Sequence, residues 1–386
     1  MAQLRRPKVL IWEALDFLGG GQKLALEIGE ALKGDFAVEF LVPGPGKLTE
    51  ALSARQVPYR FLFQNRFSRG KKSLVDILRL AMFAPRVFWG AMRTISRSKP
   101  ALIYANAAPT FLYAAVIGKL LGIPVVWHVH NYFADAKTVW LLNHFAALDS
   151  VRLIICESKA LEVQFRPRKY KVISICPGID VEGFRRFDRS EDARGALGID
   201  RAKRIVLQIG WVMPAKGQHV LVEAARDVLA QRSDVVFLLI GQNLPGHESY
   251  LAELRDRIAR YRLEGTVHIL GFWDDIQSLF AEAFVNVITS FEGFSLVMLE
   301  AAALDLPTLG PDVGGPGVVI EDGHSGMIYK FEDPKDLARG LLELLQDEPR
   351  YRRLRQNCAG FVAKYTVNRY RAEIRNTVTS LFPKSG

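Results

Sequence analysis

The sequence predicts an α/β protein with two open parallel sheets, each covered by its own helices. Short runs of β-branched and aliphatic residues alternate with longer helical patterns, as expected for parallel strands joined by helical crossovers. The alternation pauses at a polar, charged stretch, residues 182–203, and then starts again. The 386 residues, 49% of them hydrophobic, are enough for two domains with separate cores.

The elements follow in order. In the first half the predicted strands are Lys8–Trp12, Ala37–Val42, Leu102–Tyr104, Val125–His128, Leu153–Ile155 and Val172–Ile175, with helical patterns such as Gln22–Lys33 and Phe111–Leu121 between them. In the second half the predicted strands are Ile205–Ile209, Val235–Ile240, Val267–Leu270, Val285–Ile288 and Thr308–Leu309. We therefore predict a first Rossmann-like domain at 1–181, a linker at 182–203, a second at 204–365, and a C-terminal helix at 366–386 that crosses back. Ligands of such sheets bind beyond the carboxyl ends of the strands, so the expected site is a cleft between the domains.

The composition indicates the cellular compartment that we expect for the protein. The three cysteines, Cys156, Cys176 and Cys358, are odd in number and lack metal-type spacing, which indicates free thiols in a reducing cytoplasm. No apolar run approaches the ~20 residues of a membrane-spanning helix. Glu13 follows the short apolar run Val9–Trp12, which argues against a secretory signal.

Most of the +10 net charge lies between Arg60 and Lys99, which hold ten basic residues and one acid, Asp76. A seven-residue spacing makes a slowly drifting helical stripe; its members are Lys72, Arg79, Arg86 and Arg93, with Arg97 one turn further. Phe83 and Trp89 add aromatic bulk, and Pro85 is expected to kink or break the helix. The stripe predicts contact with an anionic membrane surface. A solvated helix face and nucleic-acid binding are the alternatives.

Gly19-Gly20-Gly21 follows the first strand and precedes a helix. Backbone N–H groups there can approach an anionic ligand at the start of the helix, although a plain flexible loop fits equally well. Leu24 breaks the G-x-G-x-x-G spacing of dinucleotide-binding proteins. Two histidines, His128 and His130, end a later strand and can face one space. We expect packed or solvent-facing histidines rather than a metal site, because no acid or cysteine cluster is near them in the sequence.

In the second half, the segment Ser290–Glu300 combines a strand end, a glycine turn and a helix start near Ser295. Helix-start N–H groups can hold a diphosphate, Glu292 can accept hydrogen bonds from sugar hydroxyls, and Glu300 can reach a ribose. Lys216, in the loop Met213–Gly217, can offer a point charge to phosphates. Each feature alone is weak, and the whole string carries the information.

Taken together, these strings resemble glycosyltransferase family 4, the retaining transferases with the GT-B fold. The segment Phe291–Ala301 resembles the family's E-x7-E donor motif, and Leu306-Pro307, Asp312 and Gly314-Gly315 continue it. Cys176–Asp180 is similar to the string before the domain linker. Gly19-Gly20 with Gln22 resembles the glycine pair that opens the first helix, and His130 the acceptor-domain histidine.

The resemblance implies roles. His130, Lys216 and Glu292 become the candidate catalytic residues. The candidate donor-binding residues are Gly19, Gly20, Gly21, Gly210, Trp211, Lys216, Gly271, Phe272, Glu292, Gly293, Phe294, Ser295, Leu296, Val297 and Glu300. It implies a retaining transfer from a UDP- or GDP-linked sugar to a saccharide or lipid-linked acceptor, in surface polysaccharide or glycolipid synthesis. It also implies no metal at the diphosphate, no other cofactor, no nucleic acid, and a place on the inner face of the membrane.

Trp211 departs from the family pattern, which has an arginine directly after the glycine at this point. An uncharged indole replaces a planar cation with several donors. Trp211 therefore keeps open a degenerate transferase that binds sugar nucleotides or polysaccharide without turnover. An epimerase on the same scaffold is also open, whereas a nicotinamide-dependent oxidoreductase lacks its glycine pattern in both halves.

Overall fold

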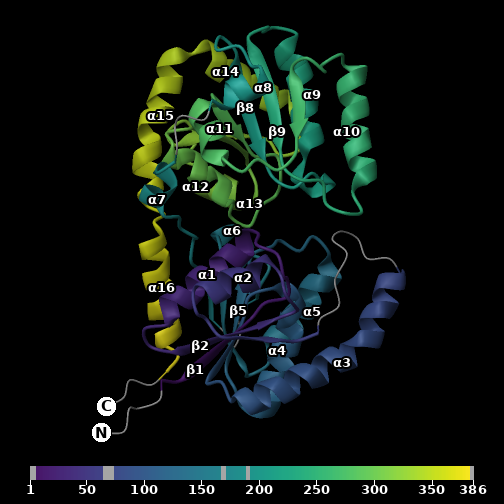
Figure 1. Ribbon diagram of the computed structural model, residues 1–386, viewed down its shortest axis with the longest axis vertical. Helices are drawn as coiled ribbons and strands as arrows, with labels where there is room; N and C mark the ends of the chain where they lie inside the picture. Colours follow the sequence, from purple (N-terminus) through teal and green to yellow (C-terminus); the bar gives the residue numbers. More distant parts are fainter. Residues whose placement is uncertain (1–5, 64–73, 167–170, 188–191, 383–386) are drawn as a thin grey trace. The chain divides into compact units, whose positions relative to one another are not determined.

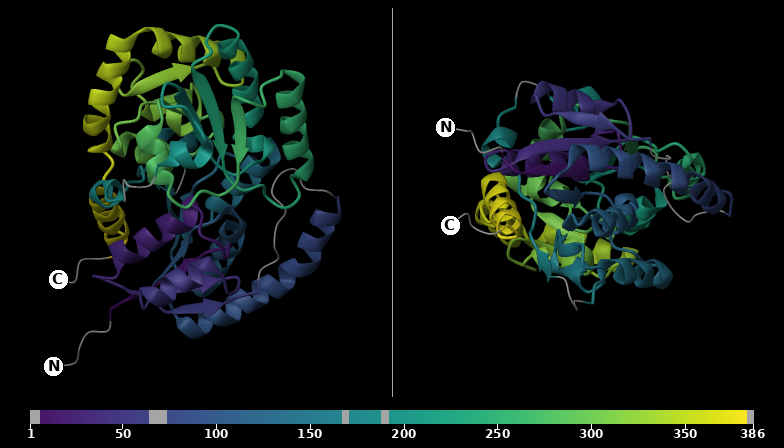
Figure 2. Two further views of the ribbon diagram at one scale, coloured as in Figure 1. Left: turned by 45° about the horizontal axis from the view of Figure 1, so that its top comes forward. Right: turned by 90° about the horizontal axis from the view of Figure 1, so that it is seen from below.

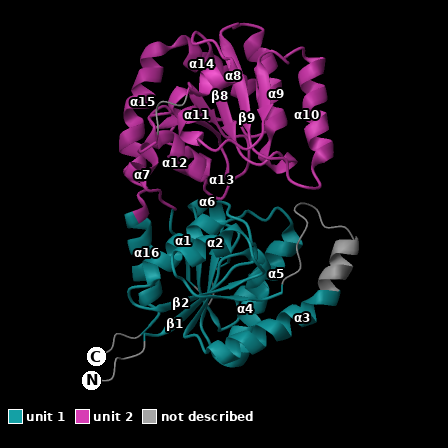
Figure 3. Cartoon of the chain, viewed as in Figure 1, with its two compact units in different colours: residues 1–176, 368–386 teal, residues 177–367 magenta. Residues whose placement is uncertain are grey.

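The computed structural model describes residues 6–63, 74–166, 171–187 and 192–382, with side chains left out for 74–81. The chain forms two compact units, residues 1–176 with 368–386 and residues 177–367 (Figure 3). Each unit contains one parallel sheet with helices packed on it (Figure 1). Among the described residues, no helix combines the length and the apolarity needed to cross a membrane.

The first unit is built on seven parallel strands in the order β3-β2-β1-β4-β5-β6-β7. The strands are β1 (Lys8–Trp12), β2 (Ala37–Val42), β3 (Tyr59–Phe61), β4 (Leu102–Ala105), β5 (Val125–Val129), β6 (Val151–Cys156) and β7 (Lys171–Ser174). The helices are α1 (Gly20–Leu32), α2 (Lys47–Ala54), α3 (Leu74–Ser98), α4 (Ala108–Leu121), α5 (Ala136–Ala146), α6 (Lys159–Glu162) and α16 (Val367–Thr379). All strands predicted here are present. The sequence missed β3, a three-residue edge strand without a buried side chain. Helix α3 continues through Pro85, so the proline does not break it.

The C-terminal helix α16 belongs to the first unit (Figure 3). Tyr370, Ile374 and Val378 recur every four residues along one face and are fully or almost fully buried, the spacing of an amphipathic helix that packs on a core. Two ion pairs join the same helix to the first third of the chain: Arg371 with Glu27 at 2.5 Å, and Arg375 with Asp35 at 2.6 Å.

The second unit is built on six parallel strands in the order β10-β9-β8-β11-β12-β13. The strands are β8 (Arg204–Ile209), β9 (Val235–Ile240), β10 (Val267–Leu270), β11 (Val285–Val287), β12 (Thr308–Pro311) and β13 (Gly326–Tyr329). The helices are α7 (Val181–Arg185), α8 (Ala193–Leu197), η1 (Pro214–Lys216), α9 (Gln218–Leu229), α10 (Glu248–Arg260), α11 (Ile276–Glu282), α12 (Leu296–Ala303), α13 (Gly314–Val319), α14 (Pro334–Gln346) and α15 (Glu348–Val362).

Both faces of this second sheet are covered, as the sequence predicts (Figure 2). Strand β9 shows why: Val235, Phe237 and Leu239 enter one hydrophobic core, while Val236, Leu238 and Ile240 enter the other. Alternate side chains of a strand point to opposite faces, so a strand buried on both faces reads as one continuous apolar run.

The range predicted as a linker, 182–203, differs in the structure. It lies in the second unit and contains most of α7 and all of α8. Ala193 of α8 is 3% exposed within the core that holds Leu279 and Phe280, and Arg185 of α7 donates from Nε to the carbonyl oxygen of Ala303 at 2.7 Å. Arg194 of α8, one of the charged residues that made the stretch look like a connection, is only 15% exposed and pairs with Glu282 at 2.8 Å.

Candidate functional site

In the first unit, four polar residues stand directly after four neighbouring strands. Glu13 follows β1, Asn106 follows β4, His130 follows β5 and Glu157 follows β6. These strands are adjacent in the sheet. Because carboxyl ends of parallel strands meet at one edge, the fold brings together residues that are up to 144 positions apart in the printed sequence.

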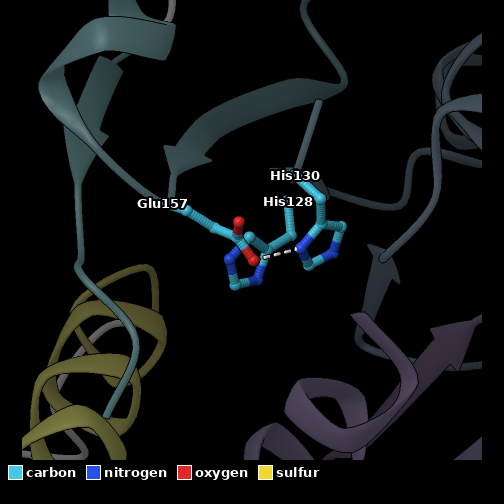
Figure 4. A group of neighbouring side chains, drawn as sticks. All are labelled: His128, His130 and Glu157. Atoms are coloured by element: carbon cyan, nitrogen blue, oxygen red, sulfur yellow. Dashed lines mark hydrogen bonds and ion pairs between the residues drawn. The ribbon is translucent and has the colours of Figure 1, made fainter. Parts of the chain in front are cut away.

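A chain of hydrogen bonds joins the four residues. Nδ1 of His130 lies 2.5 Å from Oε1 of Glu157 (Figure 4), and Nε2 of His130 lies 3.2 Å from Oδ1 of Asn106. Nδ2 of Asn106 donates to Oε2 of Glu13 at 2.8 Å and to the carbonyl oxygen of Gly21 at 3.2 Å. Glu13 is 0% exposed and Glu157 6%, so the network is shielded from water.

Burial and charge oppose each other at His130. Burial lowers the pKa of His130, but the charge of Glu157 and the hydrogen bond with it raise that pKa, aided by the charge of Glu13, and the pKa ends above its usual value. At Glu13, burial raises the carboxyl pKa although hydrogen bonds from Asn106 and Ala14 lower it.

His128 has a different environment from His130. Its Nδ1 lies 2.8 Å from the hydroxyl oxygen of Tyr104, and its Nε2 is buried and has no hydrogen-bond partner among the described residues. Burial, together with the nearby charge of His130, holds the pKa of His128 well below its usual value. The two imidazole rings lie 4.6 Å apart with planes 17° from parallel, so a neutral ring stacks against one whose proton affinity is raised.

Ligand atoms of His128, His130 and Glu157 lie within 4.8 Å of one another, close enough to hold a metal ion (Figure 4). The acid that the sequence did not place near the histidines is thus Glu157. In the structure, however, Nδ1 of His130 and the Glu157 carboxylate bond to each other. We interpret His130 and Glu157 as a hydrogen-bonded pair with His128 stacked beside it, and the expectation of no metal stays a prediction.

The glycine loop lies against the same network. Helix α1 begins at Gly20, and a Cβ added at Gly21 would lie 3.8 Å from the imidazole of His130. The backbone N–H of Gly19 donates to Oε1 of Gln22 at 3.2 Å, which closes the first turn. The structure therefore brings Gly19–Gly21 and His130 together at the end of the first sheet.

In the second unit, Lys216 and Glu292 form an ion pair. Lys216 comes after β8, Glu292 comes after β11, and these strands are adjacent. The hydroxyl of Ser290 also donates to Oε1 of Glu292, at 2.5 Å. The Lys216 side chain is 27% exposed and that of Glu292 22%, so both remain accessible to a ligand.

Hydrogen bonds from neighbouring side chains fix the backbone at Lys216. Its carbonyl oxygen accepts hydrogen bonds from Gln208 Nε2 at 3.0 Å and from Thr289 Oγ1 at 2.7 Å. Gly217 has φ +65°, and a Cβ there would lie 2.4 Å from the carbonyl oxygen of Thr289. Only glycine fits this close approach, so the loop holds the lysine in one place.

Glycines also fix the backbone of Glu292. The N–H of Gly315 donates to the Glu292 carbonyl oxygen at 2.8 Å, while Gly314, at φ +66°, would place a Cβ 2.4 Å from the same oxygen. Ser295 has φ +85° and precedes α12, which agrees with the predicted helix start. The Phe294 side chain is 1% exposed and anchors the turn in the core.

The other predicted donor residues surround this pair to different degrees. Gly210 packs closely, since a Cβ there would lie 3.5 Å from Cδ of Lys216. The carbonyl oxygen of Trp211 accepts from Gln218 Nε2 at 2.9 Å. Leu296, Val297 and Glu300 lie on α12, after Gly293 in the turn. Gly271 and Phe272 follow β10, two strands away from β8, and Phe272 is 63% exposed.

Two family models match this chain. The model "Glycosyl transferases group 1" matches residues 189–360, and the model "Glycosyltransferase Family 4" matches residues 18–182. Together they span most of both units. The chain belongs to the family 4, group 1 glycosyltransferases.

Relatives and solved structures agree with this assignment. UDP-Gal:α-D-GlcNAc-diphosphoundecaprenol α-1,3-galactosyltransferase of Escherichia coli is 23% identical over 363 residues, 88% of each chain. D-inositol 3-phosphate glycosyltransferase of Nocardioides is 30% identical over 205 residues, 50% of this chain but only 44% of that relative. Anabaena HepE, solved with UDP and glucose, has a TM-score of 0.83 at 22% identity, covering 97% of this chain and 100% of that one. The two units thus have the GT-B fold.

Only part of the basic stripe on α3 of this group 1 glycosyltransferase lies among the described residues. Lys72 lies outside the described residues, as does the side chain of Arg79. Arg86, Arg93 and Arg97 are exposed on α3, and the guanidinium of Arg86 lies over the ring of Phe63 at 4.7 Å.

Sequence reasoning missed part of the site. Glu13, Asn106 and Glu157 each follow a buried strand directly, and this position was the available signal. Gln208 and Thr289, which hold Lys216, gave none, because a polar residue inside or just after an apolar strand reads as an ordinary interruption.

Proposed function

We propose that this protein is a retaining glycosyltransferase that moves a sugar from a nucleotide-sugar donor to a saccharide or lipid-linked acceptor, in surface polysaccharide or glycolipid synthesis. The observation that carries the proposal is the pairing of Lys216 with Glu292 at the ends of adjacent strands. A cation and an acceptor of hydroxyl hydrogen bonds then stand side by side, which suits a diphosphate attached to a sugar.

Lys216 and Glu292 bind different parts of the donor in this proposal. A donor diphosphate attracts the ammonium of Lys216, whose charge opposes the negative charge that grows on the leaving group. Glu292, freed from that contact and still bonded to Ser290, accepts hydrogen bonds from the sugar hydroxyls. Nucleotide-sugar binding is further supported by the UDP and UDP-glucose bound to Anabaena HepE, and a lipid-linked acceptor by the diphosphoundecaprenol in the name of the E. coli relative.

Retention is the finer part of the proposal. If the leaving diphosphate stays on Lys216, its oxygen can take the acceptor's proton on the face it leaves from, and the sugar keeps its configuration. Proton NMR of the product reads the anomeric configuration directly, and an inverted product would contradict this part alone.

The proposal predicts selective stabilisation by the right donor. In a thermal unfolding screen across UDP- and GDP-linked sugars, a donor at about 100 times its Kd should stabilise the folded protein by about 2.7 kcal/mol. Glu292→Gln should reduce the response to the intact donor more than the response to the free nucleoside diphosphate. Lys335→Gln, on the exposed start of α14, is the control. No response to any donor would contradict the proposal.

Trp211 favours one alternative, a sugar-nucleotide-binding protein without turnover. The reason is that an uncharged indole stands where the family pattern has an arginine for the donor phosphates. An assay for transfer of labelled sugar separates the two functions. Donor binding without transfer or hydrolysis would support the alternative. An epimerase would convert the donor without any acceptor.

We also propose that the acceptor is held at an anionic membrane surface, on the inner face of the membrane, and that α3 contacts it. Residues spaced by three and four share one face of a helix, and on α3 these exposed residues are Met82, Arg86, Trp89, Arg93 and Arg97. Met82 and Trp89 are each 66% exposed. Val87, Ala91 and Ile95 on the other side are buried. Cationic and apolar side chains on one open face suit charged lipid headgroups.

Vesicle flotation tests this face. Each basic residue near an anionic surface contributes about 1 kcal/mol, so Arg93→Glu with Trp89→Ser should weaken binding to phosphatidylglycerol-containing vesicles by about tenfold or more. Arg55→Glu with Leu120→Ser makes the same change of charge and also replaces one exposed apolar residue with serine, but at positions directly after α2 and on α4, and it should have little effect. If wild type does not float with anionic vesicles at low salt, the membrane proposal fails.

A further inference from the structure

We propose that His130 is held as an imidazolium cation, and that Glu157, Asn106 and Glu13 are positioning residues that fix the charge and the orientation of its ring. The proposal deepens the function above and rests on it for its catalytic consequence. The protonation itself follows from the hydrogen-bond geometry of the first unit.

The first step is the orientation of the Asn106 amide. Its Nδ2 faces two acceptors, the Glu13 carboxylate at 2.8 Å and the carbonyl oxygen of Gly21 at 3.2 Å. Only an NH₂ group can donate to both. The carbonyl end of the amide, Oδ1, therefore faces His130, and it can only accept.

The second step concerns the His130 ring. Nε2 lies 3.2 Å from Asn106 Oδ1, and Nδ1 lies 2.5 Å from Glu157 Oε1. A neutral imidazole has one N–H and one lone pair. With an ionised Glu157, the neutral ring would set a lone pair against an acceptor oxygen on one of its two sides. The imidazolium, with two N–H groups, satisfies both contacts.

The third step is the charge around the ring. The carboxylates of Glu157, after β6, and Glu13, after β1, both attract the cation, and the pKa of His130 is raised accordingly. The neighbouring His128 of β5 is neutral, since its pKa is well below the usual value. The nearby phenols, Tyr104 of β4 and Tyr370 of α16, have pKa values raised by burial and stay neutral. One cation thus lies between two shielded carboxylates.

The network reaches the glycine loop, so the charge of His130 supports the arrangement of that loop. Nδ2 of Asn106 donates to the carbonyl oxygen of Gly21. The Gln22 side chain, whose hydrogen bonding lowers the pKa of Glu13, accepts from the backbone N–H of Gly19. When His130 loses its proton, Asn106 loses a donor and the loop loses the arrangement that depends on it. Because the His130 pKa is raised on folding, the stabilisation is present below its ordinary value and is lost as pH rises through the raised one.

Nitrogen-15 NMR of the full chain labelled at histidine tests the protonation without any substrate. The His130 signal is identified by its loss in His130→Asn. At neutral pH we expect both ring nitrogens to be protonated in wild type. In Glu157→Gln the proton should bind about tenfold more weakly or worse, the effect of losing an opposite charge within hydrogen-bond distance. Glu50→Gln, an exposed charge change on α2, should leave the signal unchanged.

A neutral His130 tautomer in wild type at pH 7 would overturn the proposal, whether or not the variants fold. So would a stoichiometric metal ion whose removal by a chelator shifts the His130 signals. In the transfer assay, the fall of kcat at high pH should move to lower pH in Glu157→Gln, and an unmoved pH profile would refute the positioning role. If no donor supports transfer, the proposed function fails, while the NMR result still decides the charge of His130.

Discussion

Replacing Lys216 with methionine is expected to lower kcat for sugar transfer by about 10²–10³-fold, the usual effect of removing one group that stabilises transition-state charge. Methionine keeps the length and the apolar stem of lysine, and the hydrogen bonds from Gln208 and Thr289 go to the backbone carbonyl oxygen at 216. The fold should therefore remain. Steady-state kinetics with the donor found by thermal shift makes the measurement.

Lys335→Met is the matched control, because it removes an exposed lysine at the start of α14 in the same unit and should leave kcat unchanged. The double variant Lys216→Met with Glu292→Gln should lose less activity than the product of the two single losses, since the partners contact each other. Full activity in Lys216→Met would show that the lysine has no role in the transfer step and that another group stabilises the leaving diphosphate.

Gly314→Ala should damage the donor site through the backbone. A non-glycine residue at φ +66° costs about 1–2 kcal/mol, and the new Cβ would lie 2.4 Å from the Glu292 carbonyl oxygen, so the turn that carries Glu292 must move. We expect a loss of stability about 1–3 kcal/mol larger than strain in φ alone produces, together with a large loss of donor affinity. Chemical denaturation and donor titration measure the two effects.

Gly323→Ala provides the comparison. Gly323 has nearly the same φ, +71°, but a Cβ there would meet no atom of the described residues within 4 Å. It should show the backbone strain without the displacement of Glu292, and it should bind donor normally. Equal effects of the two substitutions would mean that the close approach of Gly314 to Glu292 has no functional weight.

The sequence predicted most of the sheet strands because strands buried on both faces read as unbroken apolar runs, as Val235–Ile240 shows. It did not predict β3, which is a short edge strand, or β13, which begins with a glycine. The strand-turn-helix string predicted the turn at Glu292 and the helix start at Ser295. The pairing of Lys216 with Glu292 needed the sheet order, because only the crossover of the chain makes β8 and β11 neighbours.

The His130 network shows the same limit more sharply. His130 stood out at a strand end, but its partners are ordinary residues in the sequence, and Glu157 is 27 positions away. The charge of the ring depends on which end of Asn106 faces it, and that depends on Glu13 and Gly21. Such a state is a property of the assembled strand ends and cannot be read from any one motif.

The return of residues 368–386 to the first unit has a consequence for how the chain is made. In topology, the second unit is an insertion within the first, and the core residues Tyr370, Ile374 and Val378 are synthesised only after the whole second unit. The second unit can fold as soon as its own strands have emerged. The first unit cannot complete its core until residues 368–386 have followed the second unit, so the half that holds His130 matures after the strands of the second unit have emerged.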